Sequence, residues 1–220
     1  AAVLFTSGST GQPAAHGYAW GDLVNLSQLS FERLGMDPAG WIVSTVPPQH
    51  MYGLEFSVLW ALQGGMGLQA ERPFYPVDVR DRLAQVAEPR VLVTTPIHLK
   101  ALVRAELAWP PVATILSATA PLSADLARAA ERGLGAKVWE VYGCTEGGSL
   151  AMRRTAETSD WRWHPGMAVR PGADGSLVHA PHLGRDVPLG DEIEVVDAGR
   201  FRLHGRKEDR LNVAGKRASL

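Results

Sequence analysis

The sequence predicts an α/β fold, in which a parallel sheet covered by helices is followed by a small, barrel-like β-rich subdomain. Two observations lead to this prediction. Up to about residue 141, short apolar or β-branched runs alternate with longer segments of helical spacing, a pattern typical of a parallel sheet with helices on its faces. From about residue 150 the chain is rich in glycine and proline and carries only short strand-like pieces.

Composition is that of an ordinary globular protein. The chain has 220 residues, of which 45% are hydrophobic and 20% charged, which is enough for one or two domains. The formal net charge of −1 gives no electrostatic reason to expect nucleic acid or an anionic membrane as a partner. The sequence has one cysteine, Cys144, and no apolar run long enough to cross a bilayer. We therefore expect a cytoplasmic protein.

The elements of the first part are expected in strict alternation. Residues 20–34 carry leucines at helical spacing and precede Gly35, a residue type that ends helices. Ser123 is a good N-cap for a second helix over residues 123–132. The expected strands are residues 2–6, 41–45, 67–70, 91–95, 112–117 and 137–141.

The second part is expected to contain strands with alternating faces. "DEIEVV" (191–196) and "GRFRLHGR" (199–206) have this pattern. We expect residues 1–150 to form a nucleotide- and acid-binding subdomain, residues 151–205 the β-rich subdomain, and residues 206–220 a hinge.

Four loops rich in glycine, proline or hydroxyl groups each follow an expected strand. They are "TSGSTGQP" (6–13), "VPPQHMYG" (46–53), "SATAPLS" (117–123) and "YGCTEGG" (142–148). Ligands of open parallel sheets bind outside the carboxyl ends of the strands. Four such loops at one edge of the sheet predict a single site.

The first of these loops has the composition of a phosphate-binding loop. Its glycines let backbone N–H groups turn toward an anion, its Ser and Thr hydroxyls add donors, and a helix is expected beyond it. It is not a Walker A loop, because no Gly-Lys-Ser/Thr follows at the required spacing. Taken by itself, the loop fits a flexible connection as well as it fits a phosphate-binding loop.

Two further motifs carry groups suited to a nucleotide. In "YGCTEGG", Tyr142 can stack on a flat ring, Thr145 can bond to a phosphate, and Glu146 can hold Mg²⁺. In "PLGDEIEVV", Asp191 can accept hydrogen bonds from adjacent ribose hydroxyls. Without the other motifs, the simpler interpretation is that Glu146 is a solvent-exposed surface carboxylate and that Asp191 is a turn residue. Cys144 is expected to be a small buried filler, because no basic residue nearby in sequence activates it.

Two features are ambiguous by themselves. "GRKEDRLNVAGKR" (205–217) mixes basic and acidic residues and alone indicates an exposed linker. His50 lies in an apolar segment, where a histidine is more often structural than catalytic.

Taken together, these motifs resemble the adenylate-forming ligase superfamily, which includes acyl-CoA and aryl-CoA synthetases, luciferases and peptide-synthetase adenylation domains. "TSGSTGQP", "SATAPLS", "YGCTE", "LGDEIEVV" and "GRKEDRLNVAGKR" occur in the family's order and cover nearly the whole chain. "TSGSTGQPAAH", "VPPQHMYGLE" and "NVAGKRASL" further resemble ligases of bacterial aryl-polyene and xanthomonadin-type pigment pathways. This resemblance implies a ligase that uses ATP and Mg²⁺ to load an aromatic acid, such as a hydroxybenzoate, onto CoA or the phosphopantetheine of a carrier protein.

The resemblance also implies roles for individual residues. The β- and γ-phosphates of ATP would be wrapped by Thr6, Ser7, Ser9, Thr10 and Gly11, and adenine would lie between Tyr142 and the segment Ala118, Thr119, Ala120 and Pro121. Thr145 would reach the α-phosphate, Glu146 would bind Mg²⁺, and Asp191 and Arg206 would hold the ribose. His50, Tyr52, Phe56 and Gly143 would border the acid pocket, with His50 close to the chemistry, and Glu208 would be the hinge of a C-terminal lid.

The sequence departs from the family pattern in two respects. Ala14 stands where the family usually has a lysine after the proline of the phosphate loop, which removes a cation from the triphosphate site. The family's N-terminal region and C-terminal lid are not in the chain, so we expect it to be the middle of a larger ligase. The alternative is a non-catalytic nucleotide-binding module or a degenerate ligase. A Rossmann-type dehydrogenase has little support, because no Gly-x-Gly-x-x-Gly follows a strand.

Overall fold

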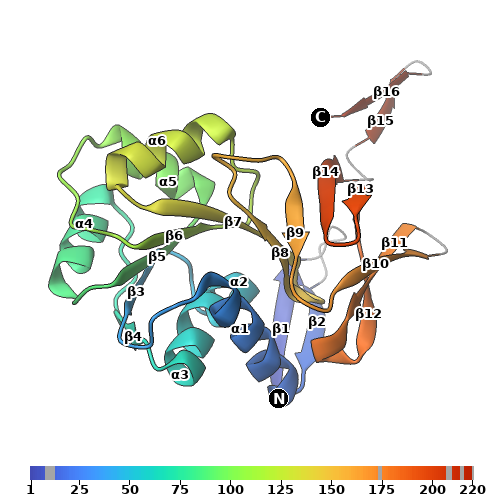
Figure 1. Cartoon of the computed structure of the whole chain (residues 1–220), viewed down its shortest axis with the longest axis horizontal. Coiled ribbons are helices and arrows are strands. Elements are labelled where there is room, and N and C mark those ends of the chain that lie inside the picture. Colours follow the sequence, from blue (N-terminus) through green and yellow to red (C-terminus); the bar gives the residue numbers. More distant parts are fainter. Residues whose placement is uncertain (8–12, 173–174, 207–209, 214–215, 220) are drawn as a thin grey trace.

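A computed structural model describes residues 1–7, 13–172, 175–206, 210–213 and 216–219. In this part of the chain, one nine-stranded mixed sheet runs through the molecule in the order β13-β14-β9-β8-β7-β6-β5-β3-β4 (Figure 1). Its strands are β3 (Trp41–Ser44), β4 (Gly67–Leu68), β5 (Arg90–Thr94), β6 (Thr114–Ser117), β7 (Lys137–Cys144), β8 (Gly148–Arg153), β9 (Trp161–Trp163), β13 (Asp191–Asp197) and β14 (Arg200–Arg206).

The strands β4, β3, β5, β6 and β7 are parallel, which confirms the predicted parallel sheet. Side chains alternate between its two faces. Val43, Leu92, Ile115 and Val138 lie side by side in register and are all buried in the core beneath one layer of helices. Their neighbours in sequence, such as Leu116, point into a second core on the opposite face. Both faces are therefore apolar, as a helix-covered sheet requires.

The helices form two layers, one on each side of this sheet (Figure 1). Residues of α4 (Pro76–Gln85), α5 (Pro96–Arg104) and α6 (Ala124–Leu134) pack in the first core. The other face is covered by α1 (Trp20–Leu34) together with a segment in which α2 (Met51–Gly53), the π-helix η1 (Leu54–Leu59) and α3 (Trp60–Gly64) follow one another directly.

The two helices that the sequence predicts are present. α1 ends at Gly35, which adopts φ 58°, because glycine tolerates the left-handed conformation of a helix C-terminus. α6 begins after Ser123, whose hydroxyl accepts a 3.2 Å hydrogen bond from the Leu126 N–H, and runs two residues further than predicted.

The second part of the chain is β-rich, as predicted, but it divides its strands between two sheets. β10 (Ala168–Gly172), β11 (Gly175–Ala180) and β12 (Arg185–Pro188) form a separate antiparallel sheet, with the short 3₁₀ turn η2 (Pro181–Leu183) between the last two. β13 and β14 instead extend the main sheet through β9. Residue 150, the expected subdomain boundary, lies inside β8, which pairs with strands on both of its sides.

The first strand corrects the sequence-based topology. β1 (Ala2–Ser7) pairs antiparallel with β2 (Pro13–Tyr18), and the two form a hairpin outside the main sheet. The strand that precedes "TSGSTGQP" therefore does not belong to the parallel sheet, and the next described element is the strand β2 rather than a helix. β2 was not predicted, because "PAAHGY" lacks the β-branched residues that usually indicate a strand.

The last described residues form a further hairpin. β15 (Arg210–Val213) and β16 (Lys216–Ser219) pair antiparallel and project away from the main sheet (Figure 1). Within the described residues, no helix is long and apolar enough to span a membrane.

Candidate active site

A cavity with a volume of about 750 Å³ lies at the carboxyl edge of the parallel strands. The predicted loops that follow β3, β6 and β7 contribute to it, whereas most of the fourth loop, residues 8–12, lies outside the described residues. The residues of the sequence motifs that line it include His50, Ala118, Thr119, Thr145, Glu146 and Asp191. The convergence of these loops on one site is thus as expected for an open parallel sheet.

The loop after β6 is held by a buried carboxylate. Oε1 of Glu140 accepts a 2.8 Å hydrogen bond from the Leu122 N–H, and Oε2 accepts bonds from Arg153 Nε at 2.8 Å and Thr155 Oγ1 at 2.6 Å. Within this loop Thr119 has φ 78°, an unfavourable conformation for a β-branched residue. The network around Glu140 therefore stabilises a strained turn that forms one wall of the cavity.

The turn between β7 and β8 carries Thr145 and Glu146 and is contacted by the β1–β2 hairpin. The Tyr18 hydroxyl donates a hydrogen bond to the Thr145 carbonyl, and His16 Nδ1 lies 3.8 Å from Oε1 of Glu146. Arg185 Nη2 donates to the Glu146 carbonyl at 3.0 Å. The hairpin that carries the glycine-rich motif is thus brought to the cavity by side-chain contacts and not by the main sheet.

Two glycines fix the position of this turn. A Cβ atom on Gly148, which has φ +67°, would lie 2.1 Å from Cδ2 of Leu26, and one on Gly143 would lie 2.1 Å from the Gly148 carbonyl oxygen. No larger residue fits at either position without a shift of the backbone or of α1. The turn therefore packs directly against the helix layer that forms the opposite wall of the cavity.

Tyr142 and Asp191 connect the two motifs that were expected to bind the nucleoside. The Tyr142 hydroxyl donates a 2.9 Å hydrogen bond to Oδ2 of Asp191. The Tyr142 ring is buried and packs against Trp161 and Phe201, with ring centroids 5.6 and 5.5 Å away. Asp191 lines the cavity, whereas Tyr142 lies behind it.

The helix layer supplies the remaining wall. Nδ1 of His50 accepts a 3.2 Å hydrogen bond from the Tyr52 N–H and so caps α2, and this leaves the proton of the neutral ring on Nε2. Partial burial lowers the pKa of His50 below 6.5. Tyr52 and Phe56 are buried and lie 5.3 Å apart between ring centroids. With Met51 and Val141 they make this end of the cavity mainly apolar.

Glu55, Ser149 and His164 form a buried polar network that the sequence analysis did not identify. Glu55 lies on the π-helix, lines the cavity and is 1% exposed. The Ser149 N–H donates to its Oε2 at 3.0 Å, and the Ser149 hydroxyl donates to its Oε1. His164 Nε2 lies 3.1 Å from Ser149 Oγ. The sequence contained an indication of this network. Glu55 is an acidic residue in an apolar segment, two residues beyond "HMYG", and a buried carboxyl group needs a hydrogen-bonding partner.

The single cysteine was expected to be a small buried filler, but Cys144 is only partly buried. Cys144 lines the cavity between Gly143 and Thr145. Burial, and then the nearby Glu146 carboxylate, raises its pKa to about 12. Cys144 therefore stays a thiol at neutral pH and is a poor nucleophile.

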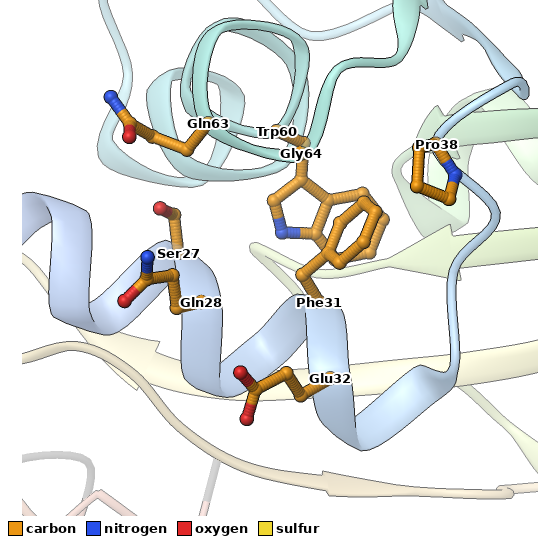
Figure 2. Close-up of a pocket in the computed structure, with 8 residues that line it drawn as sticks. All are labelled: Ser27, Gln28, Phe31, Glu32, Pro38, Trp60, Gln63 and Gly64. Carbon is orange, nitrogen blue, oxygen red and sulfur yellow. The ribbon is translucent and has the colours of Figure 1, made fainter.

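A second hollow of about 310 Å³ lies between α1 and α3. Figure 2 shows the indole of Trp60 and the ring of Phe31 at its base, with Gln28, Glu32 and Gln63 around it. Trp60 Nε1 donates a 3.0 Å hydrogen bond to Ser30 Oγ, and the two rings meet edge to face. No residue of the predicted motifs lines this hollow, so the larger cavity is the candidate active site.

The comparison with protein families decides the classification. A family model described as "AMP-binding enzyme" matches residues 1–208. The chain belongs to the AMP-binding enzyme family. It is 28% identical, over its whole length, to a 4-coumarate–CoA ligase of Rhodobacter capsulatus, and 31% identical, over 87% of its length, to an olefin β-lactone synthetase of Stenotrophomonas maltophilia. It spans 55% of the former and 35% of the latter, and about half the length of the 4-coumarate–CoA ligases that it matches.

Solved structures confirm the fold. ATP-bound MatB from Rhodopseudomonas palustris superimposes with a TM-score of 0.82 at 19% identity, over 99% of this chain and 50% of that chain. O-succinylbenzoate coenzyme A synthetase (MenE) from Bacillus subtilis, solved in complex with ATP and magnesium ion, gives a TM-score of 0.81 at 18% identity, over 99% and 52%. The mixed α/β architecture is thus that of the large N-terminal domain of adenylate-forming ligases.

For an AMP-binding enzyme, the cavity brings together many but not all of the predicted residues. The predicted residues that line it are His50, Tyr52, Phe56, Ala118, Thr119, Gly143, Thr145, Glu146 and Asp191. Ala120 and Pro121 are exposed and do not. Arg206 pairs with Asp191 across β13 and β14, which places its backbone beside the site.

The remaining predicted residues belong to segments that are described in part or not at all. Thr6 and Ser7 are in β1, and only the backbone of these two residues is described. Ser9, Thr10 and Gly11 of the phosphate loop, and Glu208 of the hinge, lie outside the described residues.

The donor set of the cavity fits a magnesium nucleotide. Mg²⁺ is usually held by one or two carboxylates together with substrate phosphates. The carboxylate of Glu146 is 41% exposed and lines the cavity next to the Thr145 hydroxyl, which can donate to a phosphate. Asp191 also lines the cavity, and its carboxylate can accept hydrogen bonds from hydroxyl groups.

Proposed function

We propose that this chain forms the nucleotide- and acid-binding part of an ATP-dependent acid–thiol ligase. In this reaction a carboxylate attacks the α-phosphorus of ATP, which gives an acyl-adenylate and pyrophosphate, and a thiol of CoA or of a carrier protein then displaces AMP. One observation carries the proposal. A single cavity holds groups suited to phosphate, metal and ribose at one end, and the buried rings of Tyr52 and Phe56, beside His50 and Glu55, at the other.

The residues at the polar end suit the first step, which depends mainly on positioning and on stabilising charge. Thr145 lies on the turn that the two glycines and Tyr18 hold in place, so its hydroxyl can be oriented before the substrate binds. A magnesium ion held by Glu146 would offset negative charge on the phosphates. Asp191, oriented by Tyr142, would fix the ribose and with it the direction of the triphosphate.

The other end of the cavity suits an aromatic acid. Tyr52 and Phe56 present buried rings, and Met51 and Val141 complete the wall. A flat ring fills such a slot better than acetate, and a cavity of about 750 Å³ that also takes a nucleotide leaves little room for a long alkyl chain. His50, neutral and at the boundary between the two ends, is placed near the carboxylate of the acid. We therefore propose a benzoate-type acid, with hydroxybenzoate as the first candidate.

The test is acid-dependent exchange of pyrophosphate into ATP by the full-length protein of which this chain is proposed to be a part. Benzoate and the hydroxybenzoates should support exchange more than 10-fold better than acetate or palmitate, since a misfitted acid is held in an unproductive geometry. Preference for a long-chain acid would refute the aromatic assignment. Binding of ATP without exchange for any acid would refute the ligase and favour a degenerate, nucleotide-binding relative.

A further inference from the structure

The acid end of the cavity contains one buried carboxyl group. Glu55 projects from the π-helix among Met51, Tyr52 and Phe56 and is 1% exposed. Burying a carboxyl group costs free energy unless it is hydrogen-bonded, and binding pockets hold such groups where they orient a ligand. The π-helix, a form often found at functional sites, turns this residue toward the cavity.

The network behind Glu55 fixes both the position and the polarity of its oxygens. The Ser149 hydroxyl has one proton, and it donates this proton to Glu55. His164 Nε2, 3.1 Å from Ser149 Oγ, must then be the donor to that oxygen. Burial lowers the pKa of His164 to about 3, so its ring is neutral with the proton on Nε2. The chain of donors runs from His164 through Ser149 to Glu55, which leaves Glu55 as the end of the chain at the cavity.

Glu55 retains hydrogen-bonding capacity beyond these contacts. The two carboxylate oxygens can together accept four hydrogen bonds; the Ser149 bonds use one on each oxygen and a bond from the Ser30 hydroxyl uses a third, so one acceptor position is left. Burial raises the pKa of Glu55 to about 7, so both the protonated and the charged form are present near neutral pH. A hydroxyl group both donates and accepts, and it therefore complements either form. A ring C–H complements neither and would only displace water from the carboxyl group.

We propose that Glu55 selects acids that carry a hydroxyl group at the end remote from their carboxylate, and that it does so by hydrogen bonding to this hydroxyl. The inference rests on the proposed function and adds its specificity-determining residue. The orientation of the bound acid follows from the charge of Glu55. A carboxylate at the floor of the pocket repels the carboxylate of the substrate, which is directed toward His50 and Thr145, where the adenylate forms.

The test compares stable acyl-adenylate mimics, so that binding is measured without turnover. The probes are benzoyl, 3-hydroxybenzoyl and 4-hydroxybenzoyl sulfamoyladenosine, titrated by calorimetry into the wild type, Glu55→Met and Glu55→Gln, with AMP as the nucleotide reference. Glu32→Gln is the matched control, because Glu32 lines the second hollow and not the cavity. Thermal melting checks that each variant is folded.

The wild type should bind the better hydroxybenzoyl mimic about 10-fold more tightly than the benzoyl mimic, because an unpaired buried polar group costs that much. Glu55→Met should abolish this ratio, Glu55→Gln should reduce it about 3-fold or more, and AMP affinity should not change. If Glu55→Met does not fold, the Gln variant decides. Equal weakening of all mimics, or no hydroxyl preference in the wild type, overturns the role of Glu55. Failure of the wild type to bind AMP and every mimic would overturn the proposed function itself.

Discussion

The Tyr142 hydroxyl donates a 2.9 Å hydrogen bond to Oδ2 of Asp191 and so joins two motifs that are 49 residues apart. Tyr142 is held by the rings of Trp161 and Phe201, whereas Asp191 faces the cavity. The aromatic cluster therefore orients the carboxylate proposed to hold the ribose. The stacking of Tyr142 on adenine stays a prediction, and the hydrogen bond to Asp191 is a contact that the sequence did not indicate.

The first prediction concerns this bond. Tyr142→Phe keeps the packing but removes the hydroxyl that orients Asp191, so AMP affinity should fall about 5- to 10-fold, as for a lost hydrogen bond of roughly 1 kcal/mol. Isothermal calorimetry measures the affinity. Tyr75→Phe, an exposed tyrosine away from the cavity, is the control. If the wild type, Tyr142→Phe and Tyr75→Phe bound AMP with equal affinity, the hydrogen bond between Tyr142 and Asp191 would have no role in nucleotide binding.

The second prediction concerns the stability of the loop after β6. Glu140 is buried, and Glu140→Ala leaves the Arg153 guanidinium and the Leu122 N–H without this partner. The free energy of unfolding should drop by about 3 kcal/mol or more, the cost of removing one member of a buried ion pair. Urea denaturation measures it. Glu88→Ala removes an exposed partner of Arg90 and should cost less than about 1 kcal/mol; equal losses would contradict the prediction.

The sequence alone indicated the elements whose signals are local. Leucine spacing and Gly35 defined α1, and Ser123 marked the start of α6. The carboxyl ends of the parallel strands, and hence the meeting of His50, Thr119 and Thr145, followed from strand–helix alternation. These predictions needed no knowledge of which strands pair.

Features that depend on non-local pairing could not be predicted. β2 is a strand because Thr6 and Ala14 lie opposite each other, although its residues have low β propensity. β13 and β14 extend the main sheet because β14 meets β9 at Phe201 and Trp161. Glu55 could not be assigned, because its partner Ser149 is 94 residues away in the sequence.

The third prediction is a pH dependence. Burial raises the pKa of Glu55 from 4.5 to about 7, so the folded protein binds this proton more tightly than the unfolded chain. Its stabilising contribution is therefore complete below about pH 4.5 and is lost as the pH rises through about 7. The pKa of His164 is lowered from 6.5 to about 3, so His164 makes the folded protein more stable as the pH rises. This contribution is the same in the wild type and in Glu55→Gln, because both keep His164.

Comparison with Glu55→Gln isolates the carboxyl group. The free energy of unfolding of the wild type, relative to that of the variant, should decrease by on the order of 3 kcal/mol between about pH 4.5 and pH 8. Urea denaturation at several pH values gives both curves. If the two curves ran parallel, Glu55 would not have a raised pKa.

The fourth prediction concerns the metal. Glu146→Gln removes the charge proposed to hold Mg²⁺ but keeps the size of the side chain. In the full-length ligase, the rate of Mg²⁺-dependent pyrophosphate release should therefore fall about 100-fold, as for other groups that stabilise transition-state charge. Glu157→Gln, on an exposed turn, is the matched control. The readout is pyrophosphate release over a magnesium titration, and unchanged rates would remove Glu146 from the metal site.

The central claim is that the cavity at the carboxyl edge binds an adenine nucleotide through Asp191 and its neighbours. The most direct test is a calorimetric titration of ATP, AMP and NAD into the wild type and Asp191→Ala. ATP and AMP should bind with one site per chain, NAD should not bind, and loss of Asp191 should weaken AMP about 10-fold or more, as expected for hydrogen bonds to a charged group. Binding of NAD, or AMP binding that does not depend on Asp191, would contradict the account.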